Sequence, residues 1–157
     1  MPARPDHDNL DEGVVRGGYL LEPAAGDGPR VNLLGSGTIL FEVMQAAATL
    51  REEGYSVAVY SITSYVELAR DAERAEQVDA ADPVWLDTIF PETDVPTVAA
   101  TDYVRALPRM IASWINGPFT ALGTDGFGMS ERRSDLRAHF KVDAASIADA
   151  ARKLASR

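Results

Sequence analysis

Short apolar runs that alternate with amphipathic segments of helical length constrain this chain most. Arg30–Leu34, Ser56–Ile62, Thr97–Ala100 and Phe119–Leu122 have the composition of short buried strands. Segments of about 10 to 15 residues with helical spacing separate several of them. Because parallel strands need such crossover connections, the pattern predicts an α/β fold with a largely parallel sheet and helices on both faces.

The first two predicted helices have recognisable ends. Thr38–Glu53 places apolar residues on one helical face, and Gly54 follows where a glycine often ends a helix. The second helix is expected to begin at Tyr65. Ser64 and Glu67 before and inside it have the spacing of a capping box, in which each side chain bonds the other residue's backbone N–H.

Three further segments are expected to be helical. Residues 103–115 have helical spacing, but Pro108 lacks an N–H and crowds the preceding turn. This proline must therefore kink the helix or start a new one. Near the end of the chain we expect short helices over 131–140 and 144–155, the second with Asp143 as its N-cap.

The N-terminal residues are expected to contribute little to the core. Residues 1–13 are polar, contain prolines and show no periodicity, which predicts a flexible arm or linker before one domain over 14–157. Val14–Leu21 is expected to be extended. The turn-rich Pro23–Pro29 then suggests a hairpin with the next strand.

Charge and cysteine content argue against several classes of function. The 24 acidic and 15 basic side chains give a net charge of −9, which repels nucleic acid and anionic membrane surfaces. The absence of cysteine removes thiolate metal sites and cysteine nucleophiles. No run approaches the ~18 apolar residues of a membrane span, and the start lacks the apolar region of a signal peptide. We therefore expect a cytoplasmic protein that binds neither nucleic acid nor membrane.

A weak candidate anion site occurs where the first buried strand meets its helix. Gly35, Ser36, Gly37 and Thr38 place backbone N–H groups at a helix N-terminus, where they can hold an anion. The segment lacks the third glycine of a dinucleotide fingerprint and the lysine of a P-loop. A structural role is the favoured interpretation: the glycines permit a tight turn, and Ser36 or Thr38 caps the helix.

The glycine-rich loop over 123–128 is the more informative candidate. Its glycines permit backbone conformations closed to other residues, and Asp125 can organise the loop by accepting hydrogen bonds from its N–H groups. Phe127 is expected to pack inward, and Arg132 and Arg133 to face a partner or acidic side chains of this domain. A structural loop is one interpretation, and a docking surface for another domain or chain is the other.

No group of residues in the sequence looks catalytic. The serines near the predicted strand ends do not lie in a G-x-S-x-G nucleophile motif, and His139 is expected to be a partly exposed helix residue. Trp85, Phe90 and Trp114 could line a ligand cavity. Packing in the core or against a partner is the favoured interpretation of these large aromatic residues.

Four sequence blocks carry a resemblance to a known family. VNLLGSGTILFEVMQAAATL, YSITSYVELARD, VAATDYVR and LGTDGFGMSERRSDLRAHFKVD begin at residues 31, 60, 98 and 122. In this order and spacing they closely resemble the C-terminal domain of the homodimeric bacterial pyruvate dehydrogenase decarboxylating component. EGVVRGGYLL resembles that family's entry into the domain.

The resemblance implies a transketolase C-terminal-like domain of three layers, with a mostly parallel sheet of about five strands. In that family, thiamine diphosphate and its Mg ion lie between two other domains, for which this chain has no matching positions. It implies that this chain binds no cofactor or metal and has no complete active site. Its role would be structural, with the thiamine diphosphate-binding domains or chains of the same dimeric enzyme as partners.

Two departures from the family pattern keep alternatives open. The stretch from Asp71 to Pro91 does not follow the family's usual tryptophan-containing pattern, and Met129 stands where an arginine is common. These differences leave the substrate open, and they suit a multi-chain transketolase-like enzyme in which this domain is a separate subunit. A stand-alone module that binds a small anion near residues 35–38 is a further hypothesis, because open parallel sheets bind ligands at their strand ends.

Overall fold

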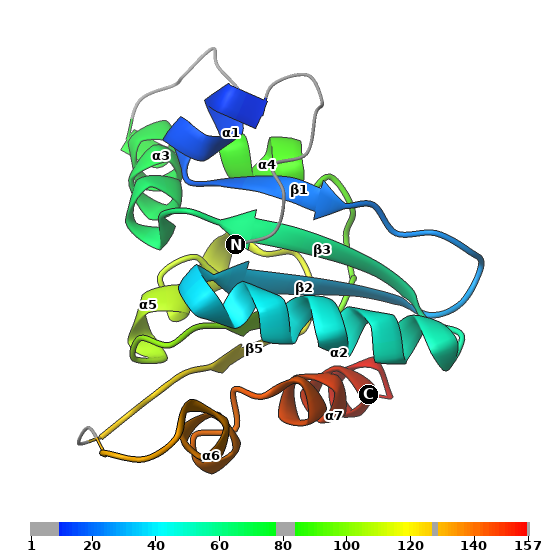
Figure 1. Cartoon of the computed structure of the whole chain (residues 1–157). Helices are drawn as coiled ribbons and strands as arrows, with labels where there is room; N and C mark the ends of the chain where they lie inside the picture. Colours follow the sequence, from blue (N-terminus) through cyan, green and yellow to red (C-terminus); the bar gives the residue numbers. More distant parts are fainter. Residues whose placement is uncertain (1–9, 78–83, 127–128, 157) are drawn as a thin grey trace.

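A five-stranded sheet forms the centre of the protein in the computed structural model, which describes residues 10–77, 84–126 and 129–156 (Figure 1). The strand order is β1-β3-β2-β4-β5. Strands β2 to β5 run parallel, and β1 is antiparallel to β3. The predicted mostly parallel α/β sheet is therefore confirmed. The strands are β1 (Gly18–Glu22), β2 (Arg30–Ser36), β3 (Ser56–Ile62), β4 (Thr97–Ala100) and β5 (Phe119–Leu122).

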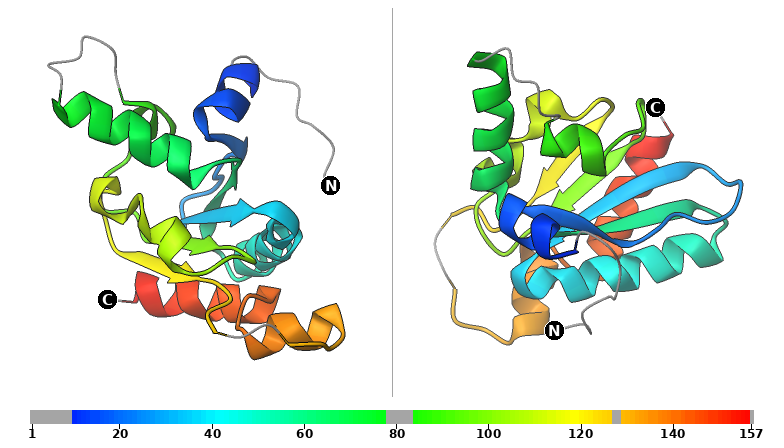
Figure 2. Two further views of the ribbon diagram at one scale, coloured as in Figure 1. Left: turned by 90° about the vertical axis from the view of Figure 1, so that its left-hand side faces the viewer. Right: turned by 90° about the horizontal axis from the view of Figure 1, so that it is seen from above.

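Helices cover both faces of the sheet and complete three layers (Figure 2). One face packs against α2 and α7, and the other against α3, α4 and the segment that contains α5. Two short 3-10 turns, η1 (Gly37–Ile39) and η2 (Ala112–Trp114), lie between these elements. The α-helices are α1 (Leu10–Arg16), α2 (Leu40–Glu52), α3 (Tyr65–Gln77), α4 (Trp85–Ile89), α5 (Ala106–Arg109), α6 (Arg133–His139) and α7 (Ala144–Ala155).

Strand β3 shows how the two cores divide. Val57 and Val59 pack in the core beneath α2 and α7, whereas Ala58, Tyr60 and Ile62 pack in the core beneath α3 and α4. Successive side chains of a strand point to opposite faces. Since both faces are covered by helices, every position of β3 is buried.

The predicted C-terminal end of α2 and the predicted start of α3 are confirmed, whereas α2 begins at Leu40 and not at Thr38, after the 3-10 turn η1. Gly54 follows α2 with a positive φ of 90°. Helix α3 begins at Tyr65, and the Glu67 backbone N–H donates to Ser64 Oγ over 3.2 Å, which is one half of the predicted capping box. These ends depend on residues close in sequence.

A helix begins within the predicted arm. Helix α1 covers residues that were assigned to the arm over 1–13 and to an extended stretch over Val14–Leu21. Leu10 is only 5% exposed, so this helix is held by packing against the domain. Only the part from Gly18 onward is extended. Residues 1–9 of the predicted arm lie outside the described residues.

The predicted hairpin between β1 and the next strand is wrong. β1 pairs with β3, with Gly18 opposite Ile62, and the 23–29 connection passes beyond β3 to reach β2. β1 therefore forms an edge of the sheet. Local turn composition could not reveal this pairing, because β3 lies about 40 residues further along the chain.

The long helix predicted over 103–115 is replaced by α5 and η2. Pro108 lies in the first turn of α5, where its missing N–H would have no helical acceptor. The proline thus belongs to a new short helix, which was one of the two predicted outcomes. The helix predicted over 131–140 is shorter, Arg133–His139.

Asp143 precedes α7 as predicted, but its side chain does not cap the helix. Glu42 of α2 performs this role instead: its Oε2 accepts a hydrogen bond from the Ala144 N–H over 2.9 Å. Its Oε1 accepts from Arg137 over 2.7 Å. One carboxylate therefore joins α2 to the start of α7 and to α6.

Candidate functional site at the carboxyl edge of the sheet

The carboxyl ends of β2 and β4 lie next to each other at the position in the sheet where the order of strand connections reverses. From β2 the chain connects to β3, its neighbour on one side, and from β3 it connects to β4, the neighbour of β2 on the other side. In open α/β sheets, ligands bind in the crevice at such a reversal. The four residues of the predicted anion site, Gly35 to Thr38, lie at this crevice.

A buried pair of hydroxyl groups closes the crevice. Ser36 Oγ donates to Thr101 Oγ1 over 2.7 Å, and Thr101 Oγ1 also accepts from the Tyr103 N–H over 3.2 Å. Ser36 therefore links the end of β2 to the residue that follows β4, and it does not cap the helix. The Tyr65 hydroxyl beside Ser36 is sealed from solvent without a hydrogen-bond partner among the described residues, and burial raises its pKa.

The turn into α2 requires both of its glycines. At Gly35 an added Cβ would lie 2.9 Å from the Leu40 Cα, so only a glycine lets the helix approach the strand this closely. Gly37 has a φ of 57°, and a Cβ there would lie 3.3 Å from Asp102 Oδ1. Thr38 donates its hydroxyl to Asp102 Oδ2 over 3.4 Å.

Asp102 changes what this turn can bind. Its carboxylate lies against Gly37 and Thr38, close to the N-terminus of α2, where a small anion would have to bind. A second negative charge there would be repelled at close range. The geometry therefore favours the structural interpretation of residues 35–38 over the small-anion module.

Asp125 joins its loop to Arg105, a residue of another loop. Its Oδ1 accepts from the Arg105 N–H over 2.8 Å, and its Oδ2 accepts from Arg105 Nε over 2.6 Å. The backbone hydrogen bond and then the Arg105 guanidinium lower the pKa of Asp125. Sequence reasoning expected bonds within the 123–128 loop, but the contact joins that loop to the segment after β4.

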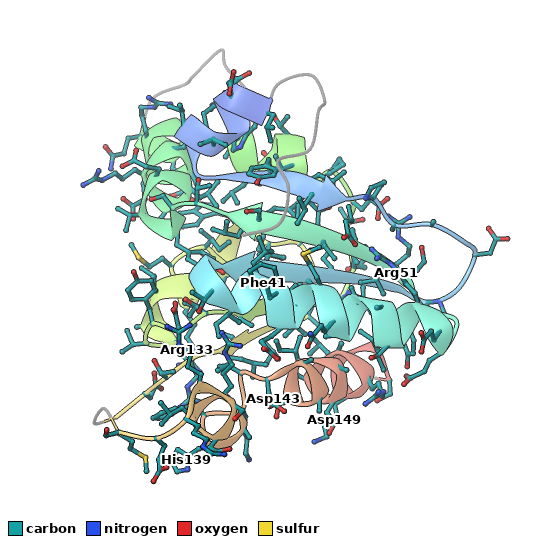
Figure 3. All side chains as sticks on the ribbon, viewed as in Figure 1. Phe41, Arg51, Arg133, His139, Asp143 and Asp149 are labelled. Carbon is teal, nitrogen blue, oxygen red and sulfur yellow. The ribbon has the colours of Figure 1, made fainter. Side chains whose placement is uncertain are left out.

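A hollow of about 530 Å³ lies beside this edge. Thr38, Asp102 and Thr124 from the three strand ends line one side, and Arg133 and Arg137 from α6 line the other. Arg137 is already paired with Glu42, whereas Arg133 forms no ion pair within the described part of the chain. Figure 3 labels Arg133 near the start of α2.

The remaining candidate residues are spread over the fold. Arg132 is exposed before α6, and His139 is exposed at the end of that helix. Trp85 and Phe90 are buried in the core beneath α3 and α4, so they are not exposed docking residues, and both also line a hollow between the sheet and α4. Trp114 is half-buried, and Phe127 lies outside the described residues.

Sequence reasoning missed the residues that hold the predicted ones in place. Asp102 and Arg105 follow β4, and Glu42 lies in α2. Each of them contacts a residue at least 20 positions away in the sequence, in another loop or helix. The only sequence signal for Asp102 was its position just after a buried strand, in the ATDY block.

The described residues contain no cluster of potential metal ligands. Over 10–77, 84–126 and 129–156, no three His, Asp or Glu side chains come together as metal ligands would. The described helices also include none that is long and apolar enough to cross a bilayer.

The fold and sequence place this chain in a defined family. Residues 17–143 match the model of the transketolase-like TK C-terminal domain. The chain belongs to this family.

Proteins similar to this chain include bacterial pyruvate dehydrogenase E1 components. This chain is 39% identical to the E1 component of Escherichia coli, over 96% of this chain. It is 40% identical to the E1 component of Buchnera aphidicola subsp. Acyrthosiphon pisum, over 98% of this chain. It spans about 18% of the length of either relative.

Solved structures share the fold. A transketolase from Leishmania mexicana superposes with a TM-score of 0.64 at 24% identity, over 93% of this chain and 19% of that chain. A split-gene transketolase, an inactive beta4 tetramer, superposes with a TM-score of 0.60 at 16% identity, over 99% of this chain and 47% of that chain. The expected three-layer transketolase C-terminal fold is thereby confirmed.

Proposed function

We propose that this chain is the C-terminal domain or a small subunit of a thiamine diphosphate-dependent pyruvate dehydrogenase, in which it supports and docks the catalytic domains. The observation that carries the proposal is its high identity, over nearly its whole length, to pyruvate dehydrogenase E1 components. Those proteins are about five times longer than the match. Decarboxylation therefore belongs to the rest of the enzyme.

The roles of this chain and of its partner domains follow from the residues that each can supply. Thiamine diphosphate and Mg are bound by partner domains or chains of the same cytoplasmic, dimeric enzyme. In support, the described residues of this chain offer no cluster of acidic ligands for such a group. Asp125 and the carboxyl-edge network instead hold loops in place for docking.

The docking face is the carboxyl edge around the segment after β4. Tyr103 and Val104 are 62% and 52% exposed there, next to the Asp125–Arg105 pair, and Met129 is 49% exposed beside the same hollow as Arg133. Apolar side chains within a polar rim are typical of protein interfaces. Arg132 and Arg133 supply charges that can steer the partner.

A binding experiment tests this face. The chain is co-expressed with the thiamine-domain polypeptide of the same source, and its association is measured by sedimentation. Val104→Asp should weaken association at least ~10-fold without unfolding the chain, because it buries a charge in an apolar contact. Val15→Asp is the matched control, since Val15 is 77% exposed on α1. Equal association of both variants would contradict the assigned face.

An activity experiment tests the function itself. The assembled enzyme, with thiamine diphosphate and magnesium, should decarboxylate pyruvate, and the isolated chain should not. Calorimetry of the isolated chain with cofactor and magnesium should show no specific binding. A saturable one-to-one isotherm for the isolated chain would overturn the proposal.

The alternative is a multi-chain transketolase-like enzyme with another substrate. The divergent Asp71–Pro91 stretch and Met129 favour it, and the split-gene transketolase carries the same fold. A substrate assay of the assembled enzyme distinguishes the two candidate functions. Turnover of a ketose phosphate, with no turnover of pyruvate or another 2-oxoacid, would select the alternative.

A further inference from the structure

A second hollow lies near the amino ends of β2 and β3, away from the proposed docking face. It measures about 820 Å³ and lies between the sheet and α4. Its walls come from three strands, β1, β2 and β3, and from the segment that runs from α4 to Glu92. It is therefore built by parts of the chain that are far apart in sequence.

Two buried polar side chains in this hollow have no hydrogen-bond partner among the described residues. Asn32 is 5% exposed and Tyr60 is 6% exposed, and both line the hollow. Neither side chain forms a hydrogen bond with any described residue, and neither is sealed from solvent as the Tyr65 hydroxyl is. Buried polar side chains nearly always have a partner. An amide and a hydroxyl that face an open hollow therefore point to a ligand.

The sheet register places these two groups on one face. Asn32 lies opposite Ala58 of β3, and Tyr60 is two positions further along the same strand. Side chains two positions apart share a face, and this diagonal separates the Cα atoms by about 8 Å. One small molecule can therefore reach both groups.

The walls are aromatic and held in place. The rings of Tyr60 and Phe90 have centroids 4.5 Å apart and are tilted by 53°. The Trp85 indole N–H donates to the Gly18 carbonyl over 2.9 Å, and the Trp85 backbone N–H donates to Asp71 over 2.7 Å. The hollow thus offers preformed apolar surface for a flat ring.

The charges around the hollow favour a neutral occupant. Arg30 and Glu92 line it and are paired at 2.7 Å, so an anionic ligand would have to compete with Glu92 for the guanidinium. Burial, and then the negative charge of Glu92, raises the pKa of Tyr60 to about 12. Its hydroxyl therefore remains a proton donor at neutral pH.

We propose that this hollow binds a neutral planar heterocycle that carries an N–H next to a carbonyl, as a nucleobase does. The Asn32 amide supplies one acceptor and one donor, which match that edge in a bidentate pair. The Tyr60 hydroxyl donates to a second acceptor of the ring. The aromatic walls cover the ring faces. This site goes beyond the proposed function, and its test does not depend on assembly or turnover.

The test uses two probes of similar shape, uracil and 1,3-dimethyluracil, with the full chain. Uracil presents the N–H and carbonyl edge, and the dimethyl compound keeps the ring but has no N–H. Titration followed by NMR should give saturable shifts of the Asn32 side-chain amide and of the backbone N–H groups of Ala58 and Tyr60. Binding should be on the order of millimolar for so small a ring. The dimethyl compound should bind at least ~10-fold more weakly.

Variants then assign the contacts. Tyr60→Phe keeps the ring packing and should weaken uracil binding ~5- to 10-fold, and Asn32→Leu should abolish saturable binding. Tyr55→Phe is the control for loss of a tyrosine hydroxyl elsewhere, because Tyr55 packs against the core on the opposite face of the sheet, and it should bind as the parent does. Equal affinity for both probes, no saturable shift with uracil, or unchanged binding by a folded Asn32→Leu chain would overturn the proposal. If Tyr60→Phe fails to fold, the two probes on the parent chain still decide.

Discussion

The two ends of the sheet differ in how their polar groups are satisfied. At the carboxyl edge, Ser36 and Thr101 bond each other across the crevice where folds of this kind bind ligands. At the amino end, Asn32 and Tyr60 face a hollow without a partner among the described residues. The position of a crevice in a fold therefore does not identify a ligand site. Unpaired polar side chains that face an open hollow, unlike the sealed Tyr65 hydroxyl, are the stronger indication of one.

The difference also separates stability from binding. A polar group that bonds another part of the chain stabilises the folded state, and its removal leaves a buried partner unpaired. A polar group with no partner gives little stability, so its removal affects only what binds there. The variants below test this distinction from the largest expected change to the smallest.

The largest effect is expected at Gly35. Gly35→Ala places a Cβ 2.9 Å from the Leu40 Cα and 3.1 Å from Val43 Cγ2, so the start of α2 must move away from β2. We expect a loss of about 2 to 3 kcal/mol in the free energy of unfolding, measured by urea denaturation. A denaturation curve that coincides with the parent's would show that α2 can move away from β2 at no cost in stability, and that the turn does not require a glycine.

The buried hydroxyl pair should show coupling. Thr101→Val removes the acceptor of both Ser36 Oγ and the Tyr103 N–H, and should cost about 1 to 3 kcal/mol. Adding Ser36→Ala should then cost less in this background than in the parent, because its hydroxyl no longer has an acceptor. Additive effects in the double-mutant cycle would argue against the pair.

Glu42 should stabilise α7 by capping it from α2. Glu42→Ala removes the acceptor of the Ala144 N–H and the partner of Arg137, and should cost about 1 to 2 kcal/mol. Glu42→Gln keeps an acceptor oxygen and is the matched control, so its thermal midpoint should lie between those of Glu42→Ala and the parent. Equal midpoints for the Gln and Ala variants would mean that charge alone matters.

Asp125 should have a smaller effect that depends on pH. Its pKa in the folded chain is lowered by Arg105, so the folded state binds a proton less readily than the unfolded chain. The contact therefore stabilises the fold above the unfolded pKa of about 4 and is lost as the pH falls below it. Asp125→Asn should lower the melting temperature slightly at pH 7, by less than Glu42→Ala. The difference should disappear near pH 2 to 3. A constant difference at both pH values would rule out the charged contact.

The smallest effect on stability is expected at Tyr60. Tyr60→Phe removes a hydroxyl that has no partner among the described residues, so the free energy of unfolding should change by less than about 0.5 kcal/mol. The same variant is expected to lose much of its affinity for uracil. A loss above about 1.5 kcal/mol would show that this hydroxyl supports the fold, and the contrast between the two ends of the sheet would fail.

Part of the candidate site was readable from the sequence. Gly35 to Thr38 and Asp125 were identified from glycine and acid positions after apolar runs, and the structure brings both segments to the same edge. Parallel strands that end together make this meeting a consequence of fold class. The partners Asp102 and Arg105 were missed, because an exposed acid or arginine after a strand has no distinctive local pattern.

The sequence by itself determined the fold class and the positions of the four parallel strands. The bounds of β3, β4 and β5 and the start of α3 agree with the prediction, because periodicity and capping depend on residues within one or two turns of each other. Only the tertiary structure decided that β1 pairs with β3, that Glu42 caps α7, and that Asn32 and Tyr60 share a hollow. These contacts join segments well separated in sequence. No local pattern records them, because they arise only when the two cores pack on opposite faces of the sheet.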